Sequence, residues 1–179
     1  VVSASHQFQL SGTGYDPHRS LTADNKSVQA DDSPVLQRAM RAAMLCNDSV
    51  LRQDDNDWKV HGDPMEGALL IAAVKVGLDA DSENHLYPRT DLIPFESEHR
   101  FMATLHHSHS GEAFIFVKGA PERLLEMCTH QRNDAGDQPM DKNYWLMQIE
   151  QMANQGQRVL AIAEKVVPQK QTELNFADV

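Results

Sequence analysis

Lys118 and Gly119 follow an apolar run, Ala113–Val117, and lead into Pro121 and Glu122. This order predicts a buried strand that delivers a lysine and a glycine to a turn. Pro121 fits the first turn of a following helix, because its missing N–H is not needed there. Gly119 has no Cβ, which allows a ligand close to its backbone. The residues alone suggest an anionic ligand at the helix start, while a strand that ends in a solvated lysine before an ordinary turn is the plainer interpretation.

Three further stretches combine glycine, proline or charged residues with apolar residues in short motifs. Gly62–Leu70 reads GDPMEGALL, Pro94–Met102 reads PFESEHRFM, and Arg158–Ala163 reads RVLAIA shortly after Gly156. Together with Lys118–Glu122 they resemble, in the same order, the GDPxEGALL, PF(D/E)SxRKxM, KGAPE and GxRVLAxA motifs of P-type cation-transporting ATPases. The resemblance is to the nucleotide-binding (N) domain of the bacterial calcium-pump-like branch.

The sequence lacks parts that a whole pump needs. The family's phosphorylated aspartate lies in a DKTGT motif, which does not occur here. No stretch approaches the roughly 18 consecutive apolar residues of a membrane span. We therefore expect residues 1–179 to be a single nucleotide-binding domain, excised from a larger membrane pump. Residues 1–5 and 168–179 are expected near the linkers to the missing phosphorylation domain, on the cytoplasmic side of the plasma (inner) membrane.

Size and charge narrow the class of protein. At 179 residues and 41% apolar content the chain can form a globular domain with a real core. Its formal net charge of −10 disfavours partners such as nucleic acid and anionic lipid. We expect a monomer with one local basic pocket, to which Arg100, Lys118 and Arg158 contribute.

The periodicity of apolar residues predicts alternating strands and helices. Strands are expected at 6–10, 58–61, 91–97, 100–107, 112–118 and 158–167, and helices at 33–47, 63–77, 121–129 and from Asp141 to Gly156. Polar loops are expected at 22–32, 79–91 and 133–137. Strands that pair through turns, with helices interspersed, predict an α+β fold with a mainly antiparallel β-sheet flanked by helices. The N domain that the motifs resemble has the same fold.

Cysteines and histidines offer a second kind of chemistry. Cys46 and Cys128 lie in apolar helical patterns, which predicts buried reduced thiols rather than a disulfide or a metal pair. His106, His107 and His109 invite a metal hypothesis. Neighbours on a strand point to opposite faces, so His106 and His107 do not form a preset chelate. Exposed histidines at a hairpin tip are the expected arrangement, with a metal sensor as the weaker alternative.

The resemblance implies a role for each residue around the adenine ring. Phe95 stacks on the base, Glu66 accepts a hydrogen bond from the exocyclic amine, and Lys118 and Gly119 line the pocket. From the residues alone, the alternative for Phe95 is a core aromatic. Glu66 is equally half of a capping box with Asp63, three residues earlier.

The resemblance also implies phosphate contacts and shows three departures. Arg158 reaches the phosphate chain, and Arg100 takes the position of a family lysine. Ser97 stands where some members have an arginine, so one cation is lost. Met65 replaces a threonine and Asp63 a glutamate found in other members. These three residues are possible further contacts, and they leave the affinity for the triphosphate open.

As the resemblance implies, the domain binds ATP by its adenine end and presents the γ-phosphate, with Mg²⁺, to the aspartate of the phosphorylation domain. The partners are then ATP and the phosphorylation and actuator domains of the same polypeptide. The fragment alone is expected to hold no catalytic residue and no metal. A Walker-type ATPase is rejected because its Gly-x4-Gly-Lys-Ser/Thr pattern is absent. The alternative is a regulatory or interaction module that works without nucleotide, and the transported cation is left open.

Overall fold

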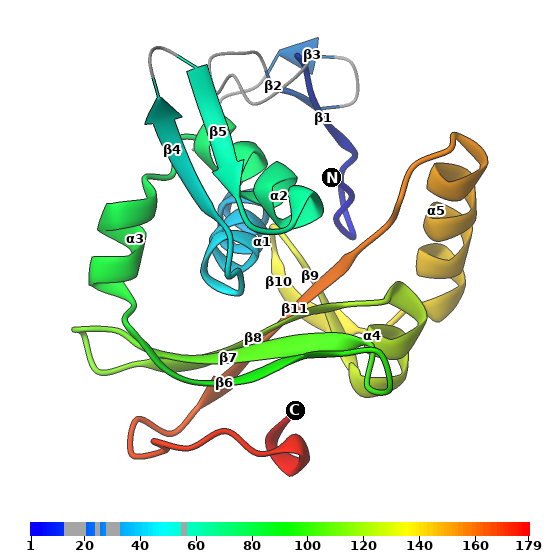
Figure 1. The fold of residues 1–179 in the computed structure, drawn as a ribbon. Helices are drawn as coiled ribbons and strands as arrows, with labels where there is room; N and C mark the ends of the chain where they lie inside the picture. Colours follow the sequence, from blue (N-terminus) through cyan, green and yellow to red (C-terminus); the bar gives the residue numbers. More distant parts are fainter. Residues whose placement is uncertain (13–20, 24–25, 28–32, 55–56) are drawn as a thin grey trace. The chain divides into compact units, whose positions relative to one another are not determined.

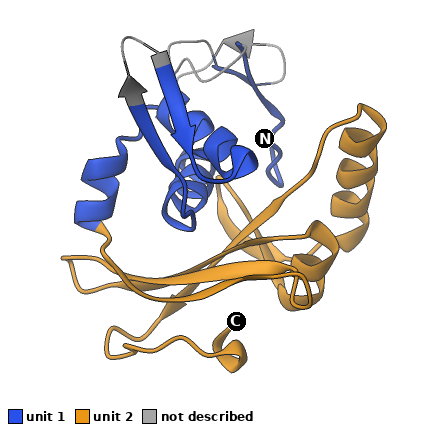
Figure 2. Ribbon diagram, viewed as in Figure 1, with its two compact units in different colours: residues 1–86 blue, residues 87–179 orange. Residues whose placement is uncertain are grey.

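The computed structural model describes residues 1–12, 21–23, 26–27, 33–54 and 57–179. Within them the chain divides into two compact units, Val1–Leu86 and Tyr87–Val179 (Figure 2). In the described part of the chain no helix has both the length and the apolar character to cross a membrane.

Unit 1 contains two small antiparallel sheets. In the first, β1 (Phe8–Leu10) pairs with β2 (Leu21–Ala23), which pairs with β3 (Lys26–Ser27). The second is a hairpin of β4 (Val50–Asp54) and β5 (Asp57–His61). The strands predicted at 6–10 and 58–61 are confirmed, whereas β4 was not predicted. β2 and β3 occupy part of the loop predicted at 22–32, and the rest of that loop lies outside the described residues.

Two helices of unit 1 begin and end where their sequences indicate. α1 (Pro34–Leu45) is capped by Ser33, whose Oγ accepts from the backbone N–H of Leu36 at 3.4 Å. α2 (Pro64–Lys75) stops before Gly77, which has a φ of +90° and donates its N–H to the carbonyl of Val74. This left-handed glycine is the stop that the sequence predicts.

The loop predicted at 79–91 is wrong over its first half, where the structure has α3 (Ala80–Leu86). Asp79 begins this helix, because its Oδ1 accepts from the backbone N–H of Ser82 at 2.9 Å. Glu83 of α3 is only 6% exposed. Its carboxylate pairs with the guanidinium of Arg41 in α1, with nitrogen–oxygen distances of 2.6 and 3.2 Å. That ion pair joins residues far apart in sequence, so the local pattern gives no sign of it.

Unit 2 is built on a four-stranded antiparallel sheet in the order β11-β8-β7-β6 (Figure 1). Its strands are β6 (Arg89–Glu96), β7 (Phe101–His107), β8 (Ala113–Gly119) and β11 (Ala161–Val167). This sheet and the helices confirm the predicted α+β class. β11 begins at Ala161, so the prediction that Arg158 opens a strand is wrong.

The remaining elements of unit 2 follow β8 and β11. They are α4 (Pro121–Met127), the hairpin of β9 (His130–Asn133) and β10 (Gly136–Pro139), α5 (Lys142–Asn154) and a short 3₁₀ helix, η2 (Phe176–Asp178). Asp141 caps α5 as predicted, because its Oδ1 accepts from the N–H of Tyr144 at 3.0 Å. The hairpin flanks the polar turn predicted at 133–137, and its strands were not predicted.

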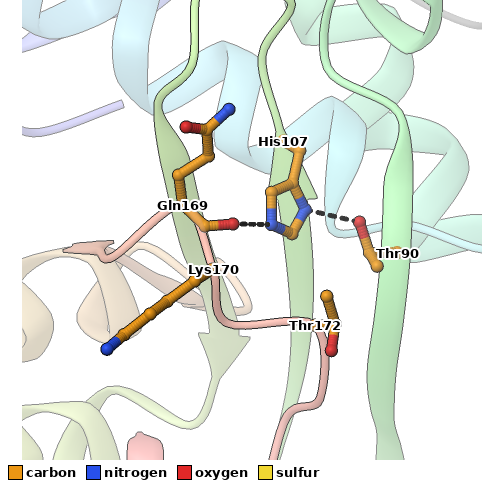
Figure 3. A pocket seen from close by; sticks show the side chains of 5 residues that line it. All are labelled: Thr90, His107, Gln169, Lys170 and Thr172. Atoms are coloured by element: carbon orange, nitrogen blue, oxygen red, sulfur yellow. Dashed lines mark hydrogen bonds between the residues drawn. The ribbon is translucent and has the colours of Figure 1, made fainter.

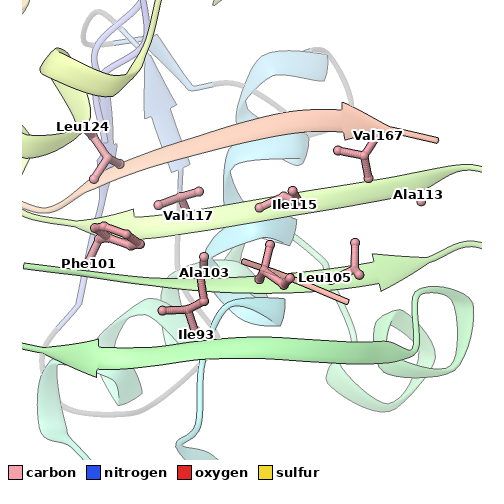
Figure 4. Close-up of a cluster of buried hydrophobic side chains, with 10 residues drawn as sticks. Ile93, Phe101, Ala103, Leu105, Ala113, Ile115, Val117, Leu124 and Val167 are labelled. Carbon is pink, nitrogen blue, oxygen red and sulfur yellow. The ribbon is translucent and has the colours of Figure 1, made fainter. Parts of the chain in front are cut away.

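One face of the sheet carries the hydrophobic core of unit 2 (Figure 4). Alternate residues of β7 and β8 point into it, as the two-residue period of a strand requires. The buried members are Ile93, Phe101, Ala103, Leu105, Ala113, Ile115, Val117, Leu124, Val167 and Leu174. The intervening side chains of β7 and β8, on the other face, are buried as well. β8 is therefore a nearly continuous apolar run up to Lys118, whereas β7 also buries the polar residues Thr104 and His106.

Candidate nucleotide-binding site

The predicted unit 2 residues gather at one end of the four-stranded sheet. At this end β6 and β8 finish while β7 and β11 begin, and the register places Phe101 and Ala161 on either side of Gly119. Lys118 is opposite Met102 on β7. The antiparallel order thus brings five predicted residues to the same end of the sheet: Phe95, Ser97, Arg100, Lys118 and Gly119. Arg158 lies just before β11 and is exposed.

Phe95 is 60% exposed, although it lies within β6. Ile93, two residues earlier, is 5% exposed and belongs to the core. The pairing of β6 with β7 shifts register between Ile93 and Glu96, a stretch that includes Phe95, so the alternation of faces does not continue through it. The interpretation of Phe95 as a core aromatic is therefore wrong. An exposed aromatic ring at a sheet end is a surface on which a flat ligand can stack.

Arg100 has an unusual backbone at the turn into β7. Its φ is +60°, and among the described residues no other non-glycine residue has a positive φ. A left-handed conformation of this kind costs a side-chain-bearing residue about 1–3 kcal/mol, so its surroundings must impose it. The N–H of Arg100 donates to the carbonyl of Glu96 at 2.8 Å, and its own carbonyl accepts from Ala120 at 2.9 Å. Both backbone groups are thus fixed.

The side chain of Arg100 is directed to α4. Its Nη1 lies 2.9 Å from Oε1 of Glu122, with 47% of the arginine side chain and 58% of the glutamate side chain exposed. An exposed pair of this kind contributes at most about 1 kcal/mol. Arg100 is therefore a cation that an anion in solvent can reach.

Lys118 and Gly119 have different environments although they are neighbours. Lys118 is 6% exposed, on the face of β8 opposite to the core residue Val117. Gly119 lies against β7, where an added Cβ would overlap the carbonyl oxygen of Arg100 and lie 2.8 Å from Cα of Phe101. The close packing of β7 thus requires a glycine here, apart from any ligand.

The motif at 62–70 forms the start of α2 in unit 1. Oδ1 of Asp63 accepts from the backbone N–H groups of Met65 at 2.8 Å and Glu66 at 3.1 Å, which confirms the predicted cap. Oε2 of Glu66 accepts from the N–H of Asp48 at 3.1 Å and from Oγ of Ser49 at 3.2 Å. Asp48 and Ser49 hold the Glu66 carboxylate, and no local pattern indicates them, because they lie 18 and 17 residues before Glu66.

The opposite end of the sheet has an open pocket lined by Thr90, His107, Gln169, Lys170 and Thr172 (Figure 3). Nδ1 of His107 is 2.6 Å from Oγ1 of Thr90, and Nε2 is 3.0 Å from the carbonyl oxygen of Gln169. Because a carbonyl only accepts, Nε2 carries the proton in this contact. None of the predicted ATP-binding residues lines this pocket.

His106 contradicts the expectation of exposed hairpin-tip histidines, because its side chain is completely buried. It points away from His107, as predicted for neighbours on a strand. Nδ1 donates to the carbonyl of Tyr87 at 2.8 Å, and Nε2 is buried with no hydrogen-bond partner in the part of the chain that the structure describes. Burial lowers the pKa of His106 to about 4, and the neighbouring side chains of Arg89 and His107 act in the same direction.

His109 is exposed, and no three metal-ligating side chains come together among the described residues. Cys46 is a buried free thiol, as predicted. Cys128 is also free but only partly buried, and burial raises the pKa of its thiol.

Comparison with known proteins identifies the family. Residues 35–179 match the family described as P-type ATPase, cytoplasmic domain N. The chain belongs to the P-type ATPases and corresponds to their cytoplasmic N domain.

Curated relatives agree with this assignment. The chain is 37% identical to the cation-transporting ATPase pma1 of Synechocystis sp., with 100% of this chain and 20% of the relative covered. It is 34% identical to the probable cation-transporting ATPase F of Mycobacterium tuberculosis over 87% of this chain and 17% of the relative. It is 28% identical to the calcium-transporting ATPase of Bacillus subtilis over 96% of this chain and 20% of the relative. The chain thus spans about a fifth of the length of these relatives.

Proposed function

We propose that this domain binds ATP through its adenine end, as part of an ATP-driven cation pump. The exposed ring of Phe95 carries the proposal, because it lies at the sheet end where the cationic side chains of Arg100 and Lys118 also occur. An aromatic ring in water and neighbouring cations suit the two halves of a nucleotide, a flat base and a phosphate chain. The family assignment supports the same ligand.

On the adenine side, Phe95 is the main contributor to affinity. Stacking of a base on an aromatic side chain is worth about 1–3 kcal/mol. Lys118 and the backbone at Gly119 line the pocket. Glu66, whose carboxylate is already held by Asp48 and Ser49, accepts the exocyclic amine of adenine. Guanine has a carbonyl oxygen at the corresponding position, so this contact favours ATP over GTP.

On the phosphate side, the exposed Arg158 and Arg100 supply charge and a fixed fork of donors. Ser97, which is exposed in the turn before β7, offers a hydroxyl where some family members have an arginine. Asp63 and Met65 at the start of α2 are possible further contacts. Because one cation is missing, we expect the isolated domain to hold the triphosphate weakly.

In the whole pump the bound nucleotide presents its γ-phosphate, with Mg²⁺, to an aspartate of the phosphorylation domain of the same polypeptide. Transfer of a phosphoryl group depends mainly on positioning and on neutralisation of charge. The phosphoenzyme then drives cation transport, and the actuator domain is the other partner. The domain lies on the cytoplasmic side of the membrane. Calcium is the cation in the name of the Bacillus subtilis relative, and it is the first candidate here.

The test is a titration of the ¹⁵N-labelled chain with ATP and then GTP, without Mg²⁺, followed by amide shifts. We expect saturable shifts at Phe95, Lys118, Gly119, Arg158 and Glu66, larger for ATP than for GTP. Phe95→Ala should weaken ATP binding by about tenfold, in line with the loss of one stacked base.

Leu92→Ala is the matched control, because Leu92 is on the same strand and 39% exposed. It should leave the ATP affinity unchanged. Absence of shifts at millimolar ATP, or equal binding by Phe95→Ala, would favour the nucleotide-independent regulatory module. We also expect no sustained ATP hydrolysis by the pure chain, which a phosphate-release assay measures.

A further inference from the structure

We propose that Glu122 determines how the site discriminates between nucleotides with different numbers of phosphates. In the absence of nucleotide its carboxylate forms an ion pair with the guanidinium of Arg100, and a phosphate group of the nucleotide displaces it. This inference rests on the proposed function, since it assumes that nucleotide binds at this end of the sheet. Glu122 is the last residue of the 118–122 motif, and the ATP contacts proposed above do not include it. The inference gives this glutamate a role. Glu122 then sets how strongly the site responds to the number of phosphates.

The backbone of Arg100 limits the exchange to the side chain. Its left-handed φ of +60° is held from both sides, by Glu96 at the N–H and by Ala120 at the carbonyl. The backbone from which the Arg100 side chain extends is therefore fixed, and binding changes only the partner of the guanidinium. Strained non-glycine residues of this kind concentrate at functional sites, where the surrounding structure imposes them.

The partner of the guanidinium is easily exchanged. The ion pair joins Nη1 of Arg100 to Oε1 of Glu122 at 2.9 Å, and about half of each side chain is exposed. A phosphate can accept two parallel hydrogen bonds from one guanidinium, with a higher charge than a carboxylate. Glu122 makes a single exposed contact with Arg100, so a phosphate that forms two bonds and carries more charge is favoured over Glu122 once nucleotide is bound.

The released carboxylate has a second effect, because it stays close to the phosphate chain. Its repulsion grows with the charge of the ligand, so Glu122 weakens ATP more than ADP, ADP more than AMP, and adenosine not at all. Salt screens this repulsion, because both groups are exposed. Glu122→Gln removes the competitor and the repulsion together while it keeps the shape of the side chain.

Glu126 provides a matched control on the same helix. It pairs with Arg123 at 3.3 Å and its side chain is 63% exposed, so Glu126→Gln removes the same charge from α4 without touching Arg100. The 179-residue chain and both variants are titrated at low salt with ATP, ADP, AMP and adenosine. We expect Glu122→Gln to bind ATP about threefold more tightly than the parent, with unchanged affinity for adenosine. Glu126→Gln should match the parent for all four ligands.

The side-chain Nε–H resonance of Arg100 reports the exchange directly. Glu122→Gln should move it in the free protein, and saturating ATP should bring the parent and the variant to a common position. If ATP binds and the two glutamine variants behave alike, or if ATP leaves the resonance of the parent in place, the exchange is wrong and the ATP site stands. If the parent shows no ATP shifts at all, the proposed function fails, and the inference fails with it.

Discussion

The two ends of the four-stranded sheet use polar side chains in opposite ways. At one end Phe95 is 60% exposed and Arg100 has a strained backbone, and neither feature stabilises the fold. At the other end both ring nitrogens of His107 have partners, and His106 is completely buried. The same strands carry both arrangements, so the contrast does not come from the architecture.

This contrast separates residues that maintain the fold from residues available to a ligand. An exposed aromatic ring, and a cation whose ion pair is half exposed, leave interaction energy available to a ligand. A histidine whose two nitrogens bond to Thr90 and Gln169 has already used its donor and acceptor. The pocket at the His107 end is therefore part of the fold, whereas the Phe95 end is the candidate site.

The largest expected effect compares two phenylalanines at the candidate end. Phe101 is 2% exposed and belongs to the core, so Phe101→Ala should lower the free energy of unfolding by about 3–5 kcal/mol. Phe95→Ala should lower it by less than about 1 kcal/mol, because most of the ring is in water already. Urea denaturation at pH 7 measures both variants. Equal losses would mean that Phe95 is a structural residue and would remove the basis of the contrast.

The buried end should show a pH dependence through His106. Its pKa falls from 6.5 to about 4 on folding, because burial disfavours the imidazolium. The neutral ring is therefore stable in the fold above pH 6.5, and this stability is lost as the pH falls from 6.5 through 4. Each pKa unit is worth about 1.36 kcal/mol, so the loss at pH 4 is about 3 kcal/mol.

His106→Asn is the matching variant for this effect. Its amide can donate to the carbonyl of Tyr87 as Nδ1 does, but it does not titrate. The parent should lose about 3 kcal/mol more than the variant between pH 7 and pH 4, measured by urea denaturation at each pH. Parallel pH profiles would show that the buried histidine does not control acid stability.

The third prediction separates two reasons for a glycine at position 119, its tight packing against β7 and the close approach of a ligand to its backbone. Gly119→Ala should lower the free energy of unfolding by about 1–3 kcal/mol, because the new Cβ overlaps the backbone of β7 at Arg100 and Phe101. The same measurement on Ala120→Gly controls for chain entropy near the turn. A variant with full stability and weakened ATP binding would assign Gly119 to the ligand alone.

The sequence predicted the elements whose signals are local. The apolar run in β8, the cap residues Asp63 and Asp141, and the stop at Gly77 each act within a few residues, and all were confirmed. The periodicity of apolar residues also placed Phe95 and Lys118 correctly on strands.

Elements that depend on distant partners were missed. The β9–β10 hairpin is polar, and Arg132 of β9 pairs with Asp137 across it and with Glu164 on β11. α3 depends in the same way on the Glu83–Arg41 pair. The burial of His106 was missed for a related reason, because a single strand pattern does not show how completely both of its faces are covered.

The smallest expected effect compares one cation at each end of the sheet. Arg158 at the candidate end and Lys170 at the other end are both exposed, so neither substitution should change the stability measurably. Arg158→Gln should weaken ATP binding by about fivefold, or about 1 kcal/mol, through the loss of a charged phosphate contact. Lys170→Gln removes the same charge from the chain and should leave the affinity unchanged. Amide titrations with ATP at fixed salt decide the matter, because a net-charge effect would weaken both variants equally. A larger loss for Lys170→Gln would place the phosphates at the His107 end.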